Sequence, residues 1–281
     1  MSEPRKSSFI SRIRGSTDTL HPSEKRLADA ILNFPGQIAS YSATELAQLA
    51  QVSNATVTRF VRKIGYASFD EARQAVRAEQ MDGAALLRVA NDDTPQDGLA
   101  ARYVEQSRLN VERSLLQITD ATLAELVSRM LSARRLWVLG FRAGQPFARY
   151  LGWQVLQARS DVLVLPRDGE TMAESLAAIG PDDCVILFAL RRPPKILGTL
   201  PALLNNTGAS VTIIGDVVGL EDMRARWHLP CATAATGPIF NHVGVMALCG
   251  MLASQVIEGA GNSGRQRLST IEDLHDSLDE L

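Results

Sequence analysis

The sequence is poor in the residues that mark secreted, metal-binding or membrane proteins. Its 281 residues include four histidines and only three cysteines, Cys184, Cys231 and Cys249. Each cysteine lies in an apolar run, as expected for small buried side chains in a reducing compartment, and no spacing links them to histidines as metal ligands. No apolar run is long enough for a membrane span, and the N-terminus has no apolar signal segment. We therefore expect a cytoplasmic protein without a metal, cofactor or membrane span.

A strong overall charge is also missing, but the charge is unevenly distributed. The formal net charge is −2. Residues 1–80 hold 11 basic and 8 acidic side chains, whereas residues 81–281 hold 18 and 23. This asymmetry places any surface that binds a polyanion in the first part of the chain.

The length and the residue pattern indicate two domains. At about 100–200 residues per domain, 281 residues suffice for two. Residues 1–80 show helical spacing and no convincing strand, whereas residues 81–98 carry the glycine, proline and aspartate residues of a linker. Residues 99–281 begin with two helical segments, 99–118 and 119–132, and then alternate between strands and helices. The predicted domains are therefore 1–80 and 99–281.

Two short helices joined by a tight turn stand out in the first domain. A helix over 20–34 precedes them, with Pro22 in its first turn and Pro35-Gly36 at its end. Ser42 and Glu45 then form a capping box, and a second cap at Ser53 starts a helix from Asn54 to about Ile64. Gly65 ends that helix, and Ser68 caps another over 69–78. This arrangement is typical of a helix-turn-helix motif.

The second helix of the motif presents chemistry suited to DNA. Its apolar stripe faces inward and leaves polar and basic side chains outside, where Asn can bond adenine, Arg can read guanine and the Thr methyl can touch thymine. Hydroxyls at the two helix starts suit phosphate contacts. The predicted DNA-binding residues are Ser42, Thr44, Ser53, Asn54, Thr56, Thr58, Arg59, Arg62 and Lys63. The alternative is an ordinary helical bundle with a solvated basic face.

The residue pattern of the second domain predicts an α/β fold. Four short apolar runs rich in β-branched residues, and a weaker fifth, alternate with helical segments; they cover 136–140, 161–166, 184–190, 210–216 and 227–232. Near-continuous apolar strands of this kind are buried on both faces, as in a parallel sheet. We therefore predict a doubly wound, parallel five-stranded domain that binds ligands at the carboxyl ends of its strands.

At these residues the chain resembles the RpiR/MurR family of bacterial transcriptional regulators. HPSEKRLADAILNFP resembles that family's opening helix, and ATELAQLAQVSNATVTRFVRKIGYASFDEAR resembles its helix-turn-helix segment. The resemblance implies a second domain of the sugar isomerase (SIS) type, with serine-rich loops that hold a sugar phosphate. Here those loops read GFRAGQP (140–146) and ALRRPPK (189–195), without the serines and threonine.

The replaced loops predict an anion site of a different kind. The ends of the first and third strands meet at one crevice in a doubly wound sheet. Clustered arginines and lysine there suit a carboxylate or a phosphate. The predicted effector-binding residues are Arg142, Gln145, Arg191, Arg192, Lys195, Glu170 and His242. The alternative is a set of solvated loop side chains, or arginines that pair with Glu170 or Asp168.

The most apolar helical segment spans 238–257 and predicts an assembly. It is apolar on more than one face, so we expect its second face to be buried against another subunit in a homodimer or a dimer of dimers. The predicted function is a non-enzymatic regulator that binds double-stranded DNA at an inverted repeat under the control of a small anionic metabolite. The alternatives are an SIS-type sugar-phosphate isomerase and a constitutive DNA-binding dimer whose second domain senses nothing.

Overall fold

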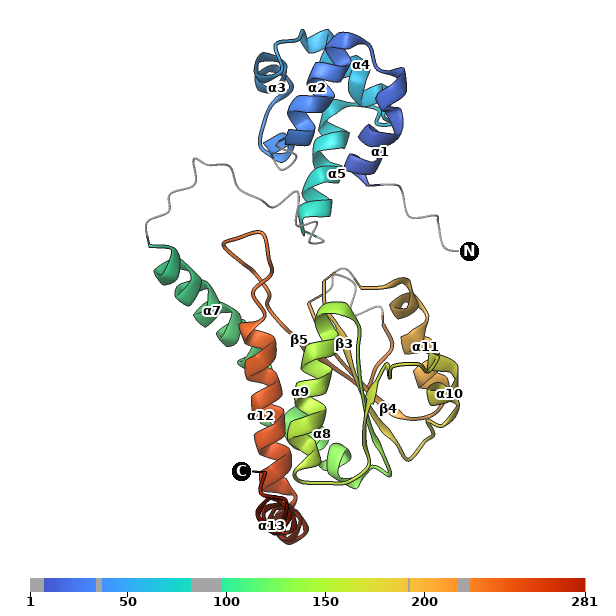
Figure 1. Ribbon diagram of the computed structural model, residues 1–281, viewed down its shortest axis with the longest axis vertical. Helices are drawn as coiled ribbons and strands as arrows, with labels where there is room; N and C mark the ends of the chain where they lie inside the picture. Colours follow the sequence, from blue (N-terminus) through green and yellow to red (C-terminus); the bar gives the residue numbers. More distant parts are fainter. Residues whose placement is uncertain (1–7, 34–36, 82–97, 192, 217–222, 281) are drawn as a thin grey trace. The chain divides into compact units, whose positions relative to one another are not determined.

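The computed structural model describes residues 8–33, 37–81, 98–191, 193–216 and 223–280. Contacts divide the chain into two compact units, Met1–Leu99 with Ala235–Phe240, and Ala100–Ala234 with Asn241–Leu281 (Figure 1). The predicted linker, 81–98, falls almost wholly outside the described residues, so the exact domain boundaries stay a prediction.

The described residues 8–81 of the N-terminal unit form helices and contain no strand. Its α-helices and 3₁₀ turns are α1 (Phe9–Ser16), η1 (Thr17–Thr19), α2 (Pro22–Asn33), η2 (Gln37–Ala39), α3 (Ala43–Leu49), α4 (Asn54–Lys63) and α5 (Phe69–Met81). Their inward side chains form one core around Phe9, Leu27 and Phe60. The predicted helices over 20–34, 54–64 and 69–78 are confirmed. Helix α1 was not predicted, although Phe9, Ile10 and Ile13 lie at helical spacing and are buried.

The predicted helix starts are confirmed in their atomic detail. Ser42 Oγ accepts from the backbone N–H of Glu45, and the Glu45 carboxylate accepts from the N–H of Ser42. Ser53 Oγ accepts from the N–H of Thr56, at 3.2 Å. Gly65, just beyond α4, has φ +89, a conformation that favours glycine and ends the helix.

The C-terminal unit is a parallel sheet covered by helices on both faces. Its strands are β1 (Leu136–Gly140), β2 (Val162–Leu165), β3 (Cys184–Ala189), β4 (Ser210–Gly215) and β5 (Trp227–Pro230), in the order β2-β1-β3-β4-β5. Every pairing is parallel. The doubly wound fold and all five strands predicted from the sequence are confirmed. The crevice of such a sheet opens where the strand order reverses, between the carboxyl ends of β1 and β3.

The helices of this unit divide between the two faces of the sheet (Figure 1). They are α7 (Leu99–Leu115), α8 (Asp120–Ser132), α9 (Gln145–Leu156), α10 (Met172–Ala177), α11 (Leu200–Asn206), α12 (Val243–Gly259) and α13 (Gly261–Leu278). Helices α8, α9 and α12 pack on the face that carries Leu136 and Val138. Helices α10 and α11 cover the face that carries Trp137 and Leu139. Strands β1 and β3 are therefore buried on both sides, which explains their lack of polar alternation. In β5, at the edge of the sheet, buried and exposed residues alternate.

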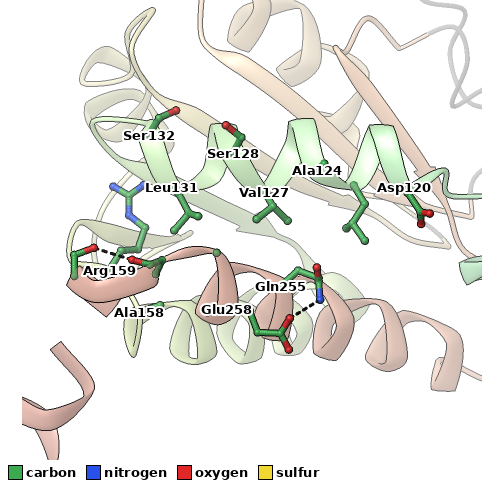
Figure 2. Close-up of a pocket in the computed structure, with 14 residues that line it drawn as sticks. Asp120, Ala124, Val127, Ser128, Leu131, Ser132, Ala158, Arg159, Gln255 and Glu258 are labelled. Carbon is green, nitrogen blue, oxygen red and sulfur yellow. Dashed lines mark hydrogen bonds between the residues drawn. The ribbon is translucent and has the colours of Figure 1, made fainter. Parts of the chain in front are cut away.

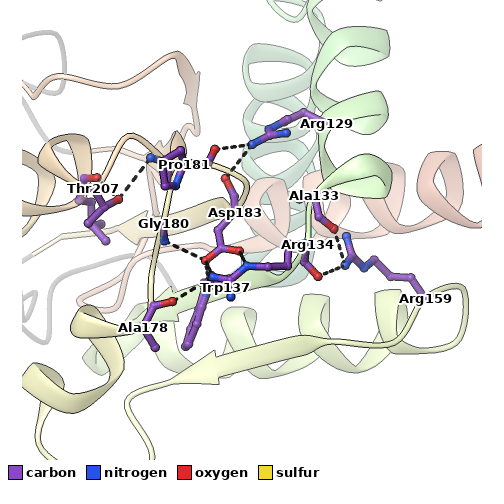
Figure 3. Close-up of polar contacts among 12 residues, drawn as sticks. Arg129, Ala133, Arg134, Trp137, Arg159, Ala178, Gly180, Pro181, Asp183 and Thr207 are labelled. Atoms are coloured by element: carbon purple, nitrogen blue, oxygen red, sulfur yellow. Dashed lines mark hydrogen bonds and ion pairs between the residues drawn. The ribbon is translucent and has the colours of Figure 1, made fainter.

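A buried carboxylate locks the amino edge of the sheet. Asp183 is fully buried and accepts hydrogen bonds from Arg134 Nη2 at 2.7 Å, Trp137 Nε1 at 3.1 Å and the backbone N–H of Gly180 at 3.0 Å (Figure 3). Burial raises the pKa of Asp183, but these hydrogen bonds outweigh it and hold the pKa below its ordinary value. This cluster joins β1 to the loop that precedes β3.

The C-terminal end of the chain differs from the sequence-based expectation. The apolar segment predicted to be helical over 238–257 is helical only from Val243, where α12 begins, and a further helix, α13, follows α12 after a bend of 104°. No single described helix is long and apolar enough to cross a membrane, and only this bent pair meets that test jointly.

Candidate functional site

The outward face of α4 carries the candidate DNA-binding surface. Asn54, Thr58, Arg59 and Arg62 are exposed. Within the described ranges, neither Arg59 nor Arg62 forms an ion pair or a side-chain hydrogen bond. Asn54 Nδ2 donates to Thr44 Oγ1 at 3.2 Å, which fixes the amide between α3 and α4. The face therefore presents two unpaired guanidinium groups and a positioned amide.

One predicted member of this face is buried and another is paired within the domain. Thr56 is only 4% exposed and its hydroxyl lies 3.0 Å from Ser53 Oγ, so its predicted outward placement is wrong. The signal was present, because Thr56 precedes the buried Phe60 by four residues and shares its face. Lys63 is engaged as well, since its Nζ lies 2.9 Å from Glu24 Oε2. It holds α4 to α2 instead of pointing away.

The Glu24 carboxylate is a buried partner of α4. It is 4% exposed and also accepts from the backbone N–H of His21 at 3.0 Å. Burial raises the pKa of Glu24, yet the His21 N–H and the Lys63 ammonium outweigh burial and leave the pKa lowered. Glu24 is thus an ionised partner that fixes the start of α2 and the end of α4.

The predicted effector loops lie at the carboxyl ends of β1 and β3. Arg142 follows β1 with φ +52 and is exposed, and Lys195, beyond β3, is exposed too. The loop after β1 packs closely on β3, because a Cβ added at Gly144 would lie 2.9 Å from Phe188 Cβ. Arg192 lies outside the described residues. The two loops are therefore neighbours at one edge of the sheet, as predicted.

Glu170 has a partner outside this crevice. Its carboxylate lies 3.6 Å from Arg167 Nη1, three residues before it, and both side chains are exposed. The predicted alternative, a pairing of the loop arginines with Glu170 or Asp168, is therefore not seen for Arg191. Arg191 instead reaches a residue that the sequence analysis did not consider.

That residue is Asp216, directly after β4. Its carboxylate Oδ2 accepts from Arg191 Nε at 3.2 Å and from the hydroxyl of Thr233, beyond β5. The Asp216 side chain is only 3% exposed. Burial raises the pKa of Asp216 and outweighs the opposing effects of Thr233 and Arg191. An acidic residue at the end of a predicted strand was the signal available in the sequence.

His242 lies at the start of α12, beside this cluster. Its ring centroid is 5.5 Å from that of Phe147 in α9, so it packs at the crevice side of that helix. Burial lowers the pKa of His242, against an opposing effect of the Asp216 charge. His242 is thus a neutral imidazole next to a buried carboxylate. Gln145, the last predicted effector residue, begins α9 and is half-buried.

A separate groove of about 810 Å³ runs between α8 and the end of α12 (Figure 2). Leu131, Val127 and Ala124 line its floor along α8, and Glu258 lies opposite. It contains none of the predicted effector residues, and its Arg159 end follows α9 and precedes β2, at the amino edge of the sheet. The described residues hold no cluster of three or more side chains suited to a metal.

Comparison with known proteins assigns the N-terminal domain. The model of the helix-turn-helix domain of the rpiR family matches residues 8–82. Residues 8–82 are therefore a helix-turn-helix domain of the rpiR family, and the helix-turn-helix motif of this domain is α3 and α4. The match confirms, for the N-terminal domain, the family predicted from the sequence.

A relative that extends beyond this domain is also named a helix-turn-helix regulator. YfhH of Escherichia coli, named an uncharacterized HTH-type transcriptional regulator, is 27% identical over 63% of this chain. The match spans 64% of YfhH, less than two thirds of its length.

Two solved structures show the fold of the whole chain and of its second unit. The Vibrio vulnificus NanR protein, complexed with ManNAc-6P, aligns with a TM-score of 0.57 at 17% identity and covers 96% of this chain and 99% of NanR. The sugar isomerase domain of an RpiR transcription factor from Sphaerobacter thermophilus aligns with a TM-score of 0.58 at 19% identity over 63% of this chain and 99% of that domain. The second unit therefore has the SIS fold.

Proposed function

We propose that this protein is a regulator that binds an inverted-repeat operator through α4. Binding of a small anionic metabolite to its SIS domain then changes its affinity for the operator. The observation that carries the DNA half is the outward face of α4, where Arg59 and Arg62 have no partner among the described residues. Two exposed arginines three residues apart on one helix repel each other unless an anion lies against them. Duplex DNA supplies such anionic groups as phosphates, and acceptor groups as guanine edges.

The two arginines have different tasks in this proposal. Arg59 lies nearer the middle of α4 and reads a base, whereas Arg62 lies in the last turn and contacts phosphate. Asn54, held by Thr44, is placed to read a base at the amino end of the helix. Lys63 holds the helix in position through Glu24 and does not add to the positive charge that faces the DNA.

The test begins with duplexes selected by the protein from a random library. Arg59→Ala should lose about 1–3 kcal/mol and relax the preference at one base pair. Arg62→Ala should weaken all sequences alike and reduce the dependence of binding on salt by about one phosphate contact. Arg265→Ala, on α13, is the matched control and should bind as the wild type does. Unchanged affinity and salt dependence in both α4 variants would remove α4 from the interface.

The sensing half rests on the basic side chains at the carboxyl edge of the sheet. Arg142 and Lys195 are exposed there and have no ion pair among the described residues, while Arg191 joins them already paired with Asp216. A ligand at the switch point of a doubly wound sheet meets all three. The NanR structure holds ManNAc-6P, and this likeness supports a phosphate or another anion here.

Operator binding titrated with phosphates and carboxylates tests this half. An effector must bind the DNA-competent and DNA-incompetent states with different affinity, so only a compound that shifts the operator isotherm qualifies. Arg142→Ala with Lys195→Ala should abolish the shift and leave operator affinity intact. A compound that is chemically converted would instead support an isomerase. A panel without any shift would support a constitutive DNA-binding dimer.

We also propose a homodimer through the outer faces of α9 and α12. Trp153 is 61% exposed, and Leu156, Val243 and Met246 are exposed as well. A Cβ added at Gly250 meets no atom within 4 Å, so this face of α12 is open to a partner. Two such faces from two copies bury each other's apolar surface and match the two-fold symmetry of an inverted repeat.

Sedimentation of the full chain tests the dimer. Met246→Glu places a charge in the proposed interface and should give monomers at micromolar concentration. Leu274→Glu, an exposed apolar position on α13, is the control and should leave the assembly unchanged. A wild-type monomer, or a Met246→Glu dimer, contradicts the proposal.

A further inference from the structure

The buried carboxylate of Asp216 uses only one of its two oxygens. Oδ2 accepts both bonds, from Arg191 Nε and from the Thr233 hydroxyl. Oδ1 is buried and has no hydrogen-bond partner among the described residues. Only 3% of the side chain is exposed. The carboxyl edge of the sheet, at the end of β4, therefore holds a buried acceptor whose bonding capacity is unfilled.

A second unfilled polar atom belongs to His242. Its Nε2 is also buried and lacks a partner in the described part of the chain. The backbone connects it to the same cluster, since the Asn241 N–H donates to the carbonyl of Thr233 at 3.3 Å and His242 follows Asn241. Thr233 thus bonds Asp216 through its hydroxyl and fixes the approach to His242 through its carbonyl.

The bonding pattern defines what fits between these atoms. A buried acceptor without a donor costs about 1–3 kcal/mol, so such groups in folded proteins usually have a partner. Arg191 already balances the Asp216 charge, which removes the need for a second cation. A bare anion is excluded, because Oδ1 repels it. A group that donates a hydrogen bond satisfies Oδ1, and the neutral imidazole can exchange a second bond with it.

We propose that Asp216 Oδ1 and His242 Nε2 form the specificity end of the effector site and bind a hydroxyl or amino group of the ligand. The inference deepens the proposed function and rests on it: the anionic end of the ligand lies at Arg142 and Lys195, and its donor-bearing end reaches Asp216. The effector class is then an anion that also carries a hydroxyl or amine, and simple carboxylates and inorganic phosphate are rejected.

Matched probes separate the two ends of the site. Hexitol 6-phosphate, 6-aminohexyl phosphate and hexyl phosphate share a phosphate and chain length but offer hydroxyls, an amine and no donor; gluconate, 6-aminohexanoate and hexanoate do the same for a carboxylate. Calorimetric titration of the full chain should show one donor-bearing probe binding about 10- to 100-fold tighter than its donor-free counterpart, the equivalent of one charge-assisted hydrogen bond. The better of the hydroxyl and amine probes identifies the donor.

Asp216→Asn then tests the residue itself. The amide oxygen can keep the Arg191 and Thr233 bonds, which places an NH₂ donor where Oδ1 accepted. The preference for donor-bearing probes should disappear. Asp273→Asn, an exposed position on α13, should keep it. The preference is a ratio within one protein, so lowered stability does not obscure it, and Asp216→Ser provides a second variant if the amide does not fold.

The outcomes distinguish this inference from the sensor proposal. Equal binding of donor-free and donor-bearing probes overturns the inference and leaves an anionic effector standing. A preference that survives in Asp216→Asn and Asp216→Ser also overturns it, because another group then reads the donor. The absence of binding by any probe, phosphate or carboxylate, overturns the inference together with the anionic sensor.

Discussion

Replacement of Asp183 by Asn tests how much the buried cluster at the amino edge contributes to the SIS domain. The carboxylate accepts four hydrogen bonds, two of them from Arg134 at 3.0 and 2.7 Å. Asn can retain the Trp137 and Gly180 bonds but loses the charge and faces the Arg134 Nε donor with its own NH₂. Charge-assisted bonds contribute about 1.5–3 kcal/mol each, but Arg134 is half exposed and water replaces part of its share. The expected loss is about 2–4 kcal/mol.

The assay is urea unfolding followed by tryptophan fluorescence. All three tryptophans, at 137, 153 and 227, lie in the C-terminal unit, so the signal reports on that unit alone. Asp182→Asn, the exposed neighbour, is the control and should change the free energy of unfolding by less than about 0.5 kcal/mol. An Asp183→Asn midpoint equal to that of the wild type at pH 7 would refute the assigned role.

The same cluster predicts a pH dependence with a definite sign. The folded pKa of Asp183 lies below its ordinary value, so the unfolded chain takes up the proton first as pH falls. The stabilisation is therefore complete above an unfolded pKa of about 3.9 and is lost as pH falls through the lower folded pKa. The gap between wild type and Asp183→Asn should stay constant from pH 7 to about pH 5 and close below pH 4.

Three further changes test the N-terminal domain and the crevice. Glu24→Gln leaves Lys63 without its ionic partner and should lower the stability of the N-terminal domain by about 1–3 kcal/mol. The loss should appear as faster amide hydrogen exchange in α2 and α4, with the exposed Glu71→Gln as a comparison. Unchanged exchange would show the pair to be dispensable. Gly65→Ala forces φ +89 on an L side chain and brings its Cβ to 3.0 Å from Arg12 Nη1. The free energy of opening measured by the same exchange should therefore fall by about 1–2 kcal/mol. Gly15→Ala, with open space around it, should leave that free energy unchanged. Gly144→Ala pushes the loop after β1 off Phe188 and should weaken effector binding more than it weakens operator binding; equal losses would show a general folding defect.

Local patterns predicted most of the fold because local physics decides it. Ser42 with Glu45, and Ser53 before Asn54, satisfy helix-end N–H groups within four residues, so no distant partner is needed to recognise them. The central strands β1, β3 and β4 were predicted from their sequence because they are buried on both faces and therefore largely apolar. The edge strand β5, in which buried and exposed residues alternate, gave a weaker signal. Helix α13 was not predicted for the opposite reason. Gly264 is its only buried residue, so its sequence shows little of the apolar periodicity that a buried helix face produces.

The partners across the chain were beyond reach of such patterns. Arg191 and Asp216 stand 25 residues apart, and only the order of the strands brings β3 and β4 together as neighbours. Lys63 reads as one more basic residue on the helix surface until Glu24 is placed beside it. Residue spacing along one helix predicts which face is buried. It does not predict which side chain from a distant part of the chain contacts the edge of that buried face.

The attachment of α4 separates the side chains that hold the helix from those that point outward. Arg12 donates to the carbonyl of Gly65 at 3.0 Å and stacks on Tyr66, with 4.6 Å between the guanidinium carbon and the ring centroid. Together with Glu24 and Ser53, it fastens both ends of the helix from inside the domain. Asn54, Thr58, Arg59 and Arg62 take no part in this fastening beyond the single bond to Thr44. If these four positions read the DNA as proposed, their substitution should alter DNA preference while the domain keeps its stability, and a laboratory library restricted to them should yield folded proteins with new preferences.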